Sequence, residues 1–90
     1  MAQIALVTGA SRGIGKATAV RLVKLGYHVI AQHRAGNPDF SEVEAAASEH
    51  GVKVTPVQAD FSDPQSVSAL LTHVKDVLGG DTLDVAVLNA

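Results

Sequence analysis

The 90-residue sequence contains no cysteine, which excludes disulfide bonds, thiolate metal sites and thiol catalysis within it. Aromatic residues make up 3% of the chain and are Tyr27, Phe40 and Phe61. Three rings are too few for the stacking surface with which proteins bind single-stranded nucleic acid. The formal net charge of −2 provides no attraction toward nucleic acid or an anionic membrane. We therefore expect neither as a partner.

Long apolar runs and basic N-terminal segments are also lacking. The first ten residues, MAQIALVTGA, contain one short apolar run and no basic residue, unlike a signal peptide or a membrane span. With 47% hydrophobic and 18% charged residues, the composition is typical of a globular domain rather than a disordered chain. We expect one domain at most, in the cytoplasm.

What the sequence does contain is an alternation of two patterns. Short apolar runs predict four strands, at residues 4–7, 29–31, 52–57 and 83–88. Segments with helical spacing of apolar residues lie between them and predict three helices. Strands that alternate with helices over short connections favour an α/β fold with a parallel sheet covered by helices.

Capping patterns predict where these helices begin. The S-x-x-E pattern at 41–44 predicts a capping box for the second helix. For the third helix two starts are open: a capping box at 62–65, or Asp63 as the cap with Pro64 at the first helical position. In the first helix the apolar residues at roughly helical spacing are Ile14, Ala17, Leu22 and Leu25.

A glycine-rich segment, TGASRGIG at 8–15, joins the first strand to the first helix. Such a turn presents backbone N–H groups and the positive end of a helix dipole, which suits an anion such as pyrophosphate. The P-loop pattern G-x-x-x-x-G-K-[ST] does not fit, because Ala10 occupies its first glycine position. In addition, Ala17 follows Lys16 where a hydroxyl is needed. This favours dinucleotide binding over ATP or GTP hydrolysis.

The segment at 8–15 resembles the G-x-x-x-G-x-G cofactor signature of the short-chain dehydrogenase/reductase family. The tripeptide at 60–62 and the segment LDVAVLNA at 83–90 match the family at appropriate distances. Leu88 replaces the first Asn of the family's N-N-A-G motif, whereas the next two residues match. The resemblance implies the N-terminal portion of a Rossmann fold: a parallel sheet of four strands in the order 3-2-1-4, with three helices. Residues 1–90 would then be a partial dinucleotide-binding domain that ends before a fifth strand.

By this resemblance the chain is the cofactor-binding half of an oxidoreductase that transfers hydride between nicotinamide and a carbonyl or alcohol. The implied cofactor-binding residues are Gly9, Ser11, Arg12, Gly13, Ile14, Gly15, Arg34, Asp60, Phe61 and Asn89. Gly9 would allow a sharp turn, Gly13 a close approach of the phosphates, and Gly15 close packing of the helix on the sheet. Asp60 would meet the adenine ring; the alternative is a loop carboxylate that accepts bonds from nearby N–H groups.

The end of the second strand bears on which dinucleotide binds. An acidic side chain there would bind the ribose 2′-hydroxyl of NAD, but no acid occurs before Asp39. Arg34 instead offers a fork of donors suited to a 2′-phosphate, and Arg12 can approach the same phosphate. We expect NADP, with NAD less favoured. The alternative is that both arginines are solvated surface charges.

The catalytic Tyr-x-x-x-Lys of the family is missing from this sequence. Tyr27, the one tyrosine, is followed four residues later by Ala31, and its place at the start of a strand predicts a packing role. We therefore assign no catalytic residue and expect these 90 residues alone to be inactive. The four histidines have no metal-ligand spacing, so no metal site is expected either.

The last predicted strand is apolar over residues 85–88 and would lie at an edge of the sheet. An apolar edge invites pairing with another chain, so we expect self-association or a homo-oligomer. This leaves a second hypothesis, a non-catalytic Rossmann half-domain that acts as a nucleotide-binding or assembly module.

Overall fold

Strands and helices alternate along the whole described chain. A computed structural model describes residues 3–10, 13–34, 39–79 and 83–87. Its elements are β1 (Ile4–Val7), α1 (Gly13–Lys24), β2 (His28–His33), α2 (Ser41–His50), β3 (Val54–Gln58), α3 (Pro64–Leu78) and β4 (Val85–Val87). The α/β class and the number of elements predicted from the sequence are confirmed.

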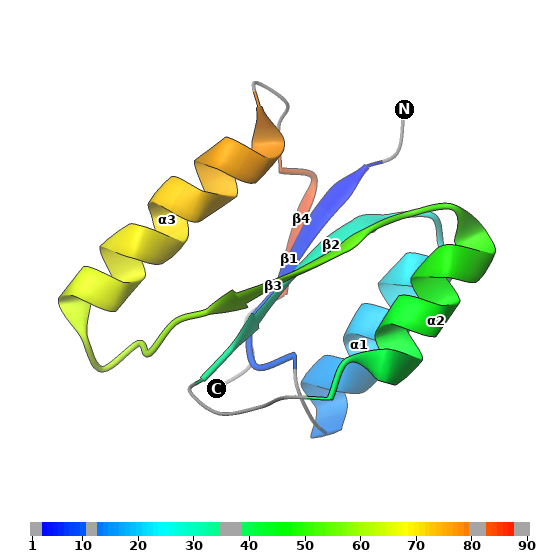
Figure 1. Cartoon of the computed structure of the whole chain (residues 1–90), viewed down its shortest axis with the longest axis horizontal. Helices are drawn as coiled ribbons and strands as arrows, with labels where there is room; N and C mark the ends of the chain where they lie inside the picture. Colours follow the sequence, from blue (N-terminus) through cyan, green and yellow to red (C-terminus); the bar gives the residue numbers. More distant parts are fainter. Residues whose placement is uncertain (1–2, 11–12, 35–38, 80–82, 88–90) are drawn as a thin grey trace.

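The four strands form one parallel sheet in the order β3-β2-β1-β4, as predicted (Figure 1). In the centre of the sheet, Leu6 lies opposite Ile30 on one side and Ala86 on the other. Pro56 lies within β3, at one edge of the sheet. An edge strand tolerates proline because one of its sides carries no ladder hydrogen bonds.

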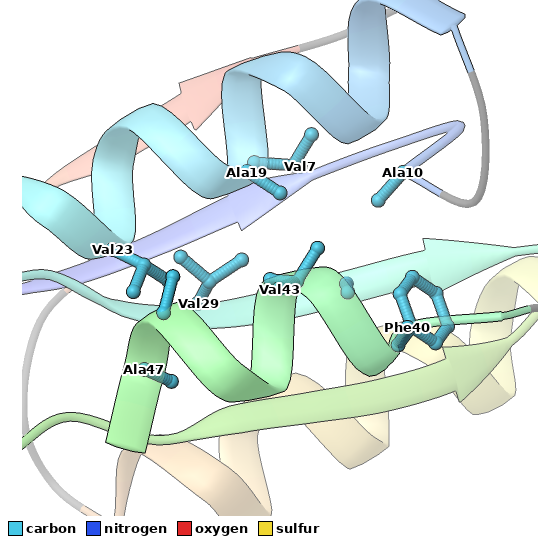
Figure 2. Packing of buried hydrophobic residues seen from close by; sticks show 10 residues of the cluster. Val7, Ala10, Ala19, Val23, Val29, Phe40, Val43 and Ala47 are labelled. Atoms are coloured by element: carbon cyan, nitrogen blue, oxygen red, sulfur yellow. The ribbon is translucent and has the colours of Figure 1, made fainter. Parts of the chain in front are cut away.

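Helices α1 and α2 cover one face of the sheet and α3 covers the other (Figure 1). Alternate residues of each strand supply the two cores, because successive side chains point to opposite faces. Val7 and Val29 pack with α1 and α2, as Figure 2 shows, whereas Ile4 and Ile30 pack with α3. Tyr27 packs against the first of these cores, which confirms its predicted packing role.

The buried side of α1 differs from the prediction. Gly15, Ala19 and Val23 are buried, whereas Ile14 is 78% exposed and Leu25 is 63% exposed. Consecutive helical residues are about 100° apart around the axis. Because Gly15 faces inward, Ile14 is turned to the side and away from the core. Close packing at a small residue, rather than side-chain size, decides which side of this helix is buried.

The start of α3 follows the second of the two alternatives. Asp63 is the cap, its Oδ1 accepts the Gln65 N–H at 3.0 Å, and Pro64 is the first helical residue.

The capping box predicted at 41–44 is wrong, because Ser41 is already the first residue of α2 and Phe40 occupies the cap position. The N–H and hydroxyl of Ser41 both donate to Oδ1 of Asp39, at 2.9 and 2.6 Å. A carboxylate is the stronger acceptor and takes both donors.

Strand β4 is shorter than the predicted 83–88, and Leu88 lies outside the described residues. Asp84 fixes its start: its N–H donates to the Ile4 carbonyl at 2.9 Å and its Oδ2 accepts the Ile4 N–H at 2.8 Å. Self-association through this strand stays a prediction. Over the described ranges, the helices are too short or too polar to cross a bilayer.

We expect Asp63→Ala to lower the free energy of unfolding by about 1 kcal/mol, because the Gln65 N–H loses its cap. Urea unfolding followed by circular dichroism measures this change. Asp63→Asn, which keeps a side-chain oxygen, is the control and should recover most of the loss. Equal stability of Asp63→Ala and the unsubstituted chain would show that the cap contributes nothing.

Candidate functional site

Three connections meet at the carboxyl edge of the sheet, where ligands bind in open α/β folds. The glycine segment follows β1, Arg34 follows β2, and residues 59–62 follow β3. Since β1, β2 and β3 are neighbours in the sheet, these connections are brought side by side (Figure 1).

The glycine segment brings the first turn of α1 close to the end of β1. Gly9 and Gly13 have φ of 60° and 62°, in the left-handed region that favours glycine. A Cβ on Gly15 would overlap the carbonyl oxygen of Gly9 and lie 2.7 Å from its carbonyl carbon. The close approach expected at Gly15 is therefore present, but its partner is the Gly9 backbone rather than the face of the sheet.

The first amides after β1 are bonded within the protein. Thr8 N–H donates to the Val87 carbonyl at 3.0 Å, Gly9 N–H to Oε1 of Gln32 at 2.7 Å, and Ala10 N–H to the Gln32 carbonyl at 2.9 Å. Amides for an anion must therefore come from later in the segment. Residues 13–15 begin α1, and amides in a first turn have no carbonyl partner earlier in their own helix. The start of α1 is thus the part of the segment whose amides could hold an anion.

Gln32 was missed as a site residue by the sequence analysis. It is 1% exposed, and besides accepting from Gly9 it donates from Nε2 to the Ala59 carbonyl at 2.6 Å. One side chain on β2 therefore bonds the segment after β1 and the segment after β3. Gln32 directly follows the strand predicted at 29–31, which in the structure extends to His33 and so includes it.

The end of β2 carries a cation and no carboxylate. Arg34 is exposed, and the preceding His33 is 8% exposed. Nδ1 of His33 lies 2.7 Å from the Arg34 carbonyl, and because a carbonyl accepts, this nitrogen carries the proton. The His33 ring also contacts Phe40 edge to face, with centroids 5.6 Å apart.

Asp60 is held by the segment in which it lies. Its Oδ1 accepts the Ser62 hydroxyl at 2.7 Å and the Ser62 N–H at 2.9 Å, while its own N–H donates to Oγ of Ser66 at 2.7 Å. The hydroxyl bond and then the backbone bond lower the pKa of Asp60; slight desolvation opposes them, and the charge of Arg34 adds to the lowering. Asp60 is thus a loop carboxylate with a local partner, and contact with adenine stays a prediction.

Phe61 is 51% exposed beside Asp60. The same tripeptide, Asp-Phe-Ser, also begins α2 at 39–41, with the same two bonds from serine to aspartate. There Phe40 is 4% exposed and lies in the core. The shared turn therefore does not decide whether its phenylalanine is buried. At 60–62 the ring of Phe61 is exposed to solvent at the edge of the site.

The structure brings most of the predicted site residues to one edge of the sheet. These are Gly9, Gly13, Ile14, Gly15, Arg34, Asp60 and Phe61. Ser11, Arg12 and Asn89 lie outside the described residues.

Comparison with known proteins agrees with this arrangement. Residues 3–90 match the family model described as short chain dehydrogenase. The chain is 37% identical over 90 residues to the 3-oxoacyl-[acyl-carrier-protein] reductase of Staphylococcus aureus and covers 100% of itself and 36% of that protein. It is 42% identical over 60 residues to the L-rhamnose 1-dehydrogenase (NADP(+)) of Thermoplasma acidophilum, covering 67% of the chain and 24% of that enzyme.

Among solved structures, the L-sorbose reductase of Gluconobacter frateurii, complexed with NADPH and L-sorbose, superposes with a TM-score of 0.83 at 31% identity. The match covers 99% of this chain and 33% of the reductase. The chain thus spans about a third of the length of the relatives it matches.

We expect Gly15→Ala to destabilise the fold by about 1–3 kcal/mol, because the added methyl group would overlap the Gly9 carbonyl. Gly13→Ala is the matched control: its Cβ would meet no atom within 4 Å, so only the positive φ opposes it, at about 1 kcal/mol. Chemical unfolding of both variants measures the difference. A Gly15→Ala variant no less stable than Gly13→Ala would contradict the close contact.

We expect Ser62→Ala to raise the pKa of Asp60 toward its ordinary value of 3.8, because the hydroxyl bond is the largest cause of the lowering. A lowered folded-state pKa stabilises the fold above the ordinary pKa, and this contribution is lost as pH falls through the folded-state pKa. Protonation of Asp60 at low pH should therefore reduce the free energy of unfolding less in the variant than in the unsubstituted chain. NMR titration of side-chain carboxyl carbons measures the pKa. Asp39, whose pKa Ser41 lowers in the same way, is the internal control and should not change.

Proposed function

The chain belongs to the short-chain dehydrogenase/reductase family, and we propose that it forms the cofactor-binding half of an NADP-dependent oxidoreductase. Such an enzyme transfers hydride between the nicotinamide ring and a carbonyl or alcohol substrate. The observation that carries the proposal is the convergence of the glycine segment, Arg34 and residues 60–62 at the carboxyl edge of one parallel sheet.

The pyrophosphate is proposed to bind at the start of α1. The packing of Gly15 on Gly9 leaves bare backbone there, and the space beside Gly13 is open, since a Cβ would meet no atom within 4 Å. The amides of residues 13–15 and the positive end of the helix dipole would hold the phosphate oxygens. Gly9 would act through the shape of its turn, because its N–H is bonded to Gln32.

Selectivity for NADP is proposed to come from Arg34. The residue is exposed after β2, and β2 has no carboxylate to accept bonds from a ribose 2′-hydroxyl or to repel a phosphate. Arg12 is proposed as the second cation. The similarity to an L-rhamnose 1-dehydrogenase (NADP(+)) and to an L-sorbose reductase complexed with NADPH supports this choice over NAD.

The adenine ring is proposed to lie at residues 60–62. The exposed ring of Phe61 offers a surface for stacking, and the ionised Asp60 offers an acceptor for a base N–H group. Asn89 is proposed to contact the cofactor near β4.

When bound, the cofactor would donate or accept the hydride, and the residues named above would hold and orient the cofactor. The proton transfer that accompanies hydride transfer would need an acid–base group, and the one tyrosine of the sequence, Tyr27, packs against the core instead. We therefore propose that catalytic residues outside this sequence complete the enzyme, and that the 90 residues alone bind the cofactor without turnover.

Calorimetric titration of the protein with NADPH and, separately, with NADH tests the proposal. We expect tighter binding of NADPH, and we expect Arg34→Asp to weaken NADPH binding at least about tenfold, or about 1.4 kcal/mol, while NADH binding is kept. The reason is that the substitution replaces a phosphate donor with a repelling carboxylate. Arg21→Asp, in the last turn of α1 and far from the site, is the control for the change in charge.

Equal affinity of the unsubstituted protein for the two coenzymes would overturn the selectivity. Absence of binding to either coenzyme would overturn the function.

A further inference from the structure

Strand β2 places one buried polar side chain, Gln32, between the two parts of the proposed cofactor site. We propose that Gln32 is a positioning residue: its amide group holds the glycine segment after β1 and the segment after β3 at a fixed spacing. The pyrophosphate and adenine parts of one dinucleotide would then fit both segments at once. This inference rests on the proposed function and adds to it a residue that does not itself touch the cofactor.

The bridge consists of two short hydrogen bonds made by one buried side chain. Oε1 of Gln32 accepts the Gly9 N–H at 2.7 Å, and Nε2 donates to the Ala59 carbonyl at 2.6 Å. The side chain is 1% exposed. The two partners are 23 residues before and 27 residues after it in sequence, in the segments that follow the two strands flanking β2 (Figure 1).

The chemistry of the partners allows few alternatives at this position. A backbone N–H can only donate and a backbone carbonyl can only accept, so the bridging side chain needs one acceptor and one donor. A carboxylate has no donor for Ala59, methionine has no strong group for either partner, and asparagine is one methylene shorter. The bond from Gln32 to the Ala59 carbonyl is buried, so water does not replace it when it is lost, and the unpaired carbonyl bears the desolvation cost.

The bridge lies directly beside the residues proposed to bind cofactor. On one side, Gly9 packs under Gly15 at the start of α1. On the other, Ala59 precedes Asp60, whose N–H is tied to Ser66 of α3. A shift of either bonded segment therefore moves a ligand-facing group.

Main-chain bonds should preserve the fold when the bridge is removed. Ala10 N–H donates to the Gln32 carbonyl at 2.9 Å, and Ala59 N–H donates to the His33 carbonyl at 2.9 Å. Neither bond involves the Gln32 side chain. Gln32→Met, which has nearly the same length, removes the two side-chain bonds and leaves these in place.

The test compares Gln32→Met with a core variant of similar cost. Val23→Ala is the control, because Val23 is fully buried in α1, eight residues beyond Gly15 and away from the site. We expect Gln32→Met to weaken NADPH binding about tenfold, and Val23→Ala to leave it within about twofold. Adenosine 2′-phosphate lacks the pyrophosphate, so it would not contact the amides of residues 13–15, and it should lose much less affinity for Gln32→Met than NADPH does.

Amide hydrogen exchange without ligand separates this inference from the proposed function. The Gly9 amide should exchange about tenfold faster in Gln32→Met and should be unchanged in Val23→Ala. If the unsubstituted protein binds NADPH but Gln32→Met binds it equally well, the inference is overturned and the proposed function stands.

If the unsubstituted protein binds no dinucleotide, the proposed function is overturned, and with it the role in cofactor positioning. Gly9 exchange then still shows whether the bridge holds the segment. Equal losses of NADPH and adenosine 2′-phosphate affinity would show general damage to the site and would also overturn the inference.

Discussion

The contact between Gly15 and the Gly9 carbonyl is the constraint on which the rest of the site depends. It holds the first turn of α1 directly against the end of β1, so that the N-terminal end of the helix dipole lies at the carboxyl edge of the sheet. It also fixes the rotation of α1: with Gly15 inward, Ala19 and Val23 follow on the buried side at intervals of four residues. The absence of a side chain at Gly15 thereby sets both the position of the N-terminal end of the helix and the residues that it buries.

Gln32 shows the opposite solution, a polar group placed where the strand is otherwise apolar. Burying an amide costs free energy unless its polar atoms are hydrogen-bonded, and here Oε1 and Nε2 are each paired with a backbone group. The net gain in stability from such a pair is small, because the unfolded chain makes equivalent bonds to water. What the bridge provides is geometric, since it relates the segments after two strands that do not touch each other.

The sequence allowed the order of elements and the sheet topology to be predicted, because apolar runs and helical spacing record burial directly. The helix ends were harder. The S-x-x-E pattern at 41–44 predicted the wrong cap because the stronger acceptor, Asp39, stands two residues earlier. The buried side of α1 was missed because apolar spacing points to large side chains such as Ile14, whereas glycine packing decided the rotation. The sequence showed that no acid stands at position 32, but it did not show the role of Gln32. The two partners of its side chain are far away in sequence and become its neighbours only through strand pairing.

The charges at the carboxyl edge bear on how selectivity can arise from so few groups. The bonds from Ser62 are the main cause of the lowered pKa of Asp60, and the positive charge of Arg34 adds to it. A cation and an anion therefore already lie near each other at this edge. Both are solvent-exposed, and exposed charges interact weakly, typically by less than about 1 kcal/mol. Asp60 therefore does not neutralise Arg34 toward a ligand. A 2′-phosphate carries more charge than one carboxylate and accepts two parallel bonds from a guanidinium, whereas a ribose hydroxyl gains little there. With His33 bonded to the adjacent carbonyl and no acid on β2, these charges are the physical basis of the proposed preference for a 2′-phosphate.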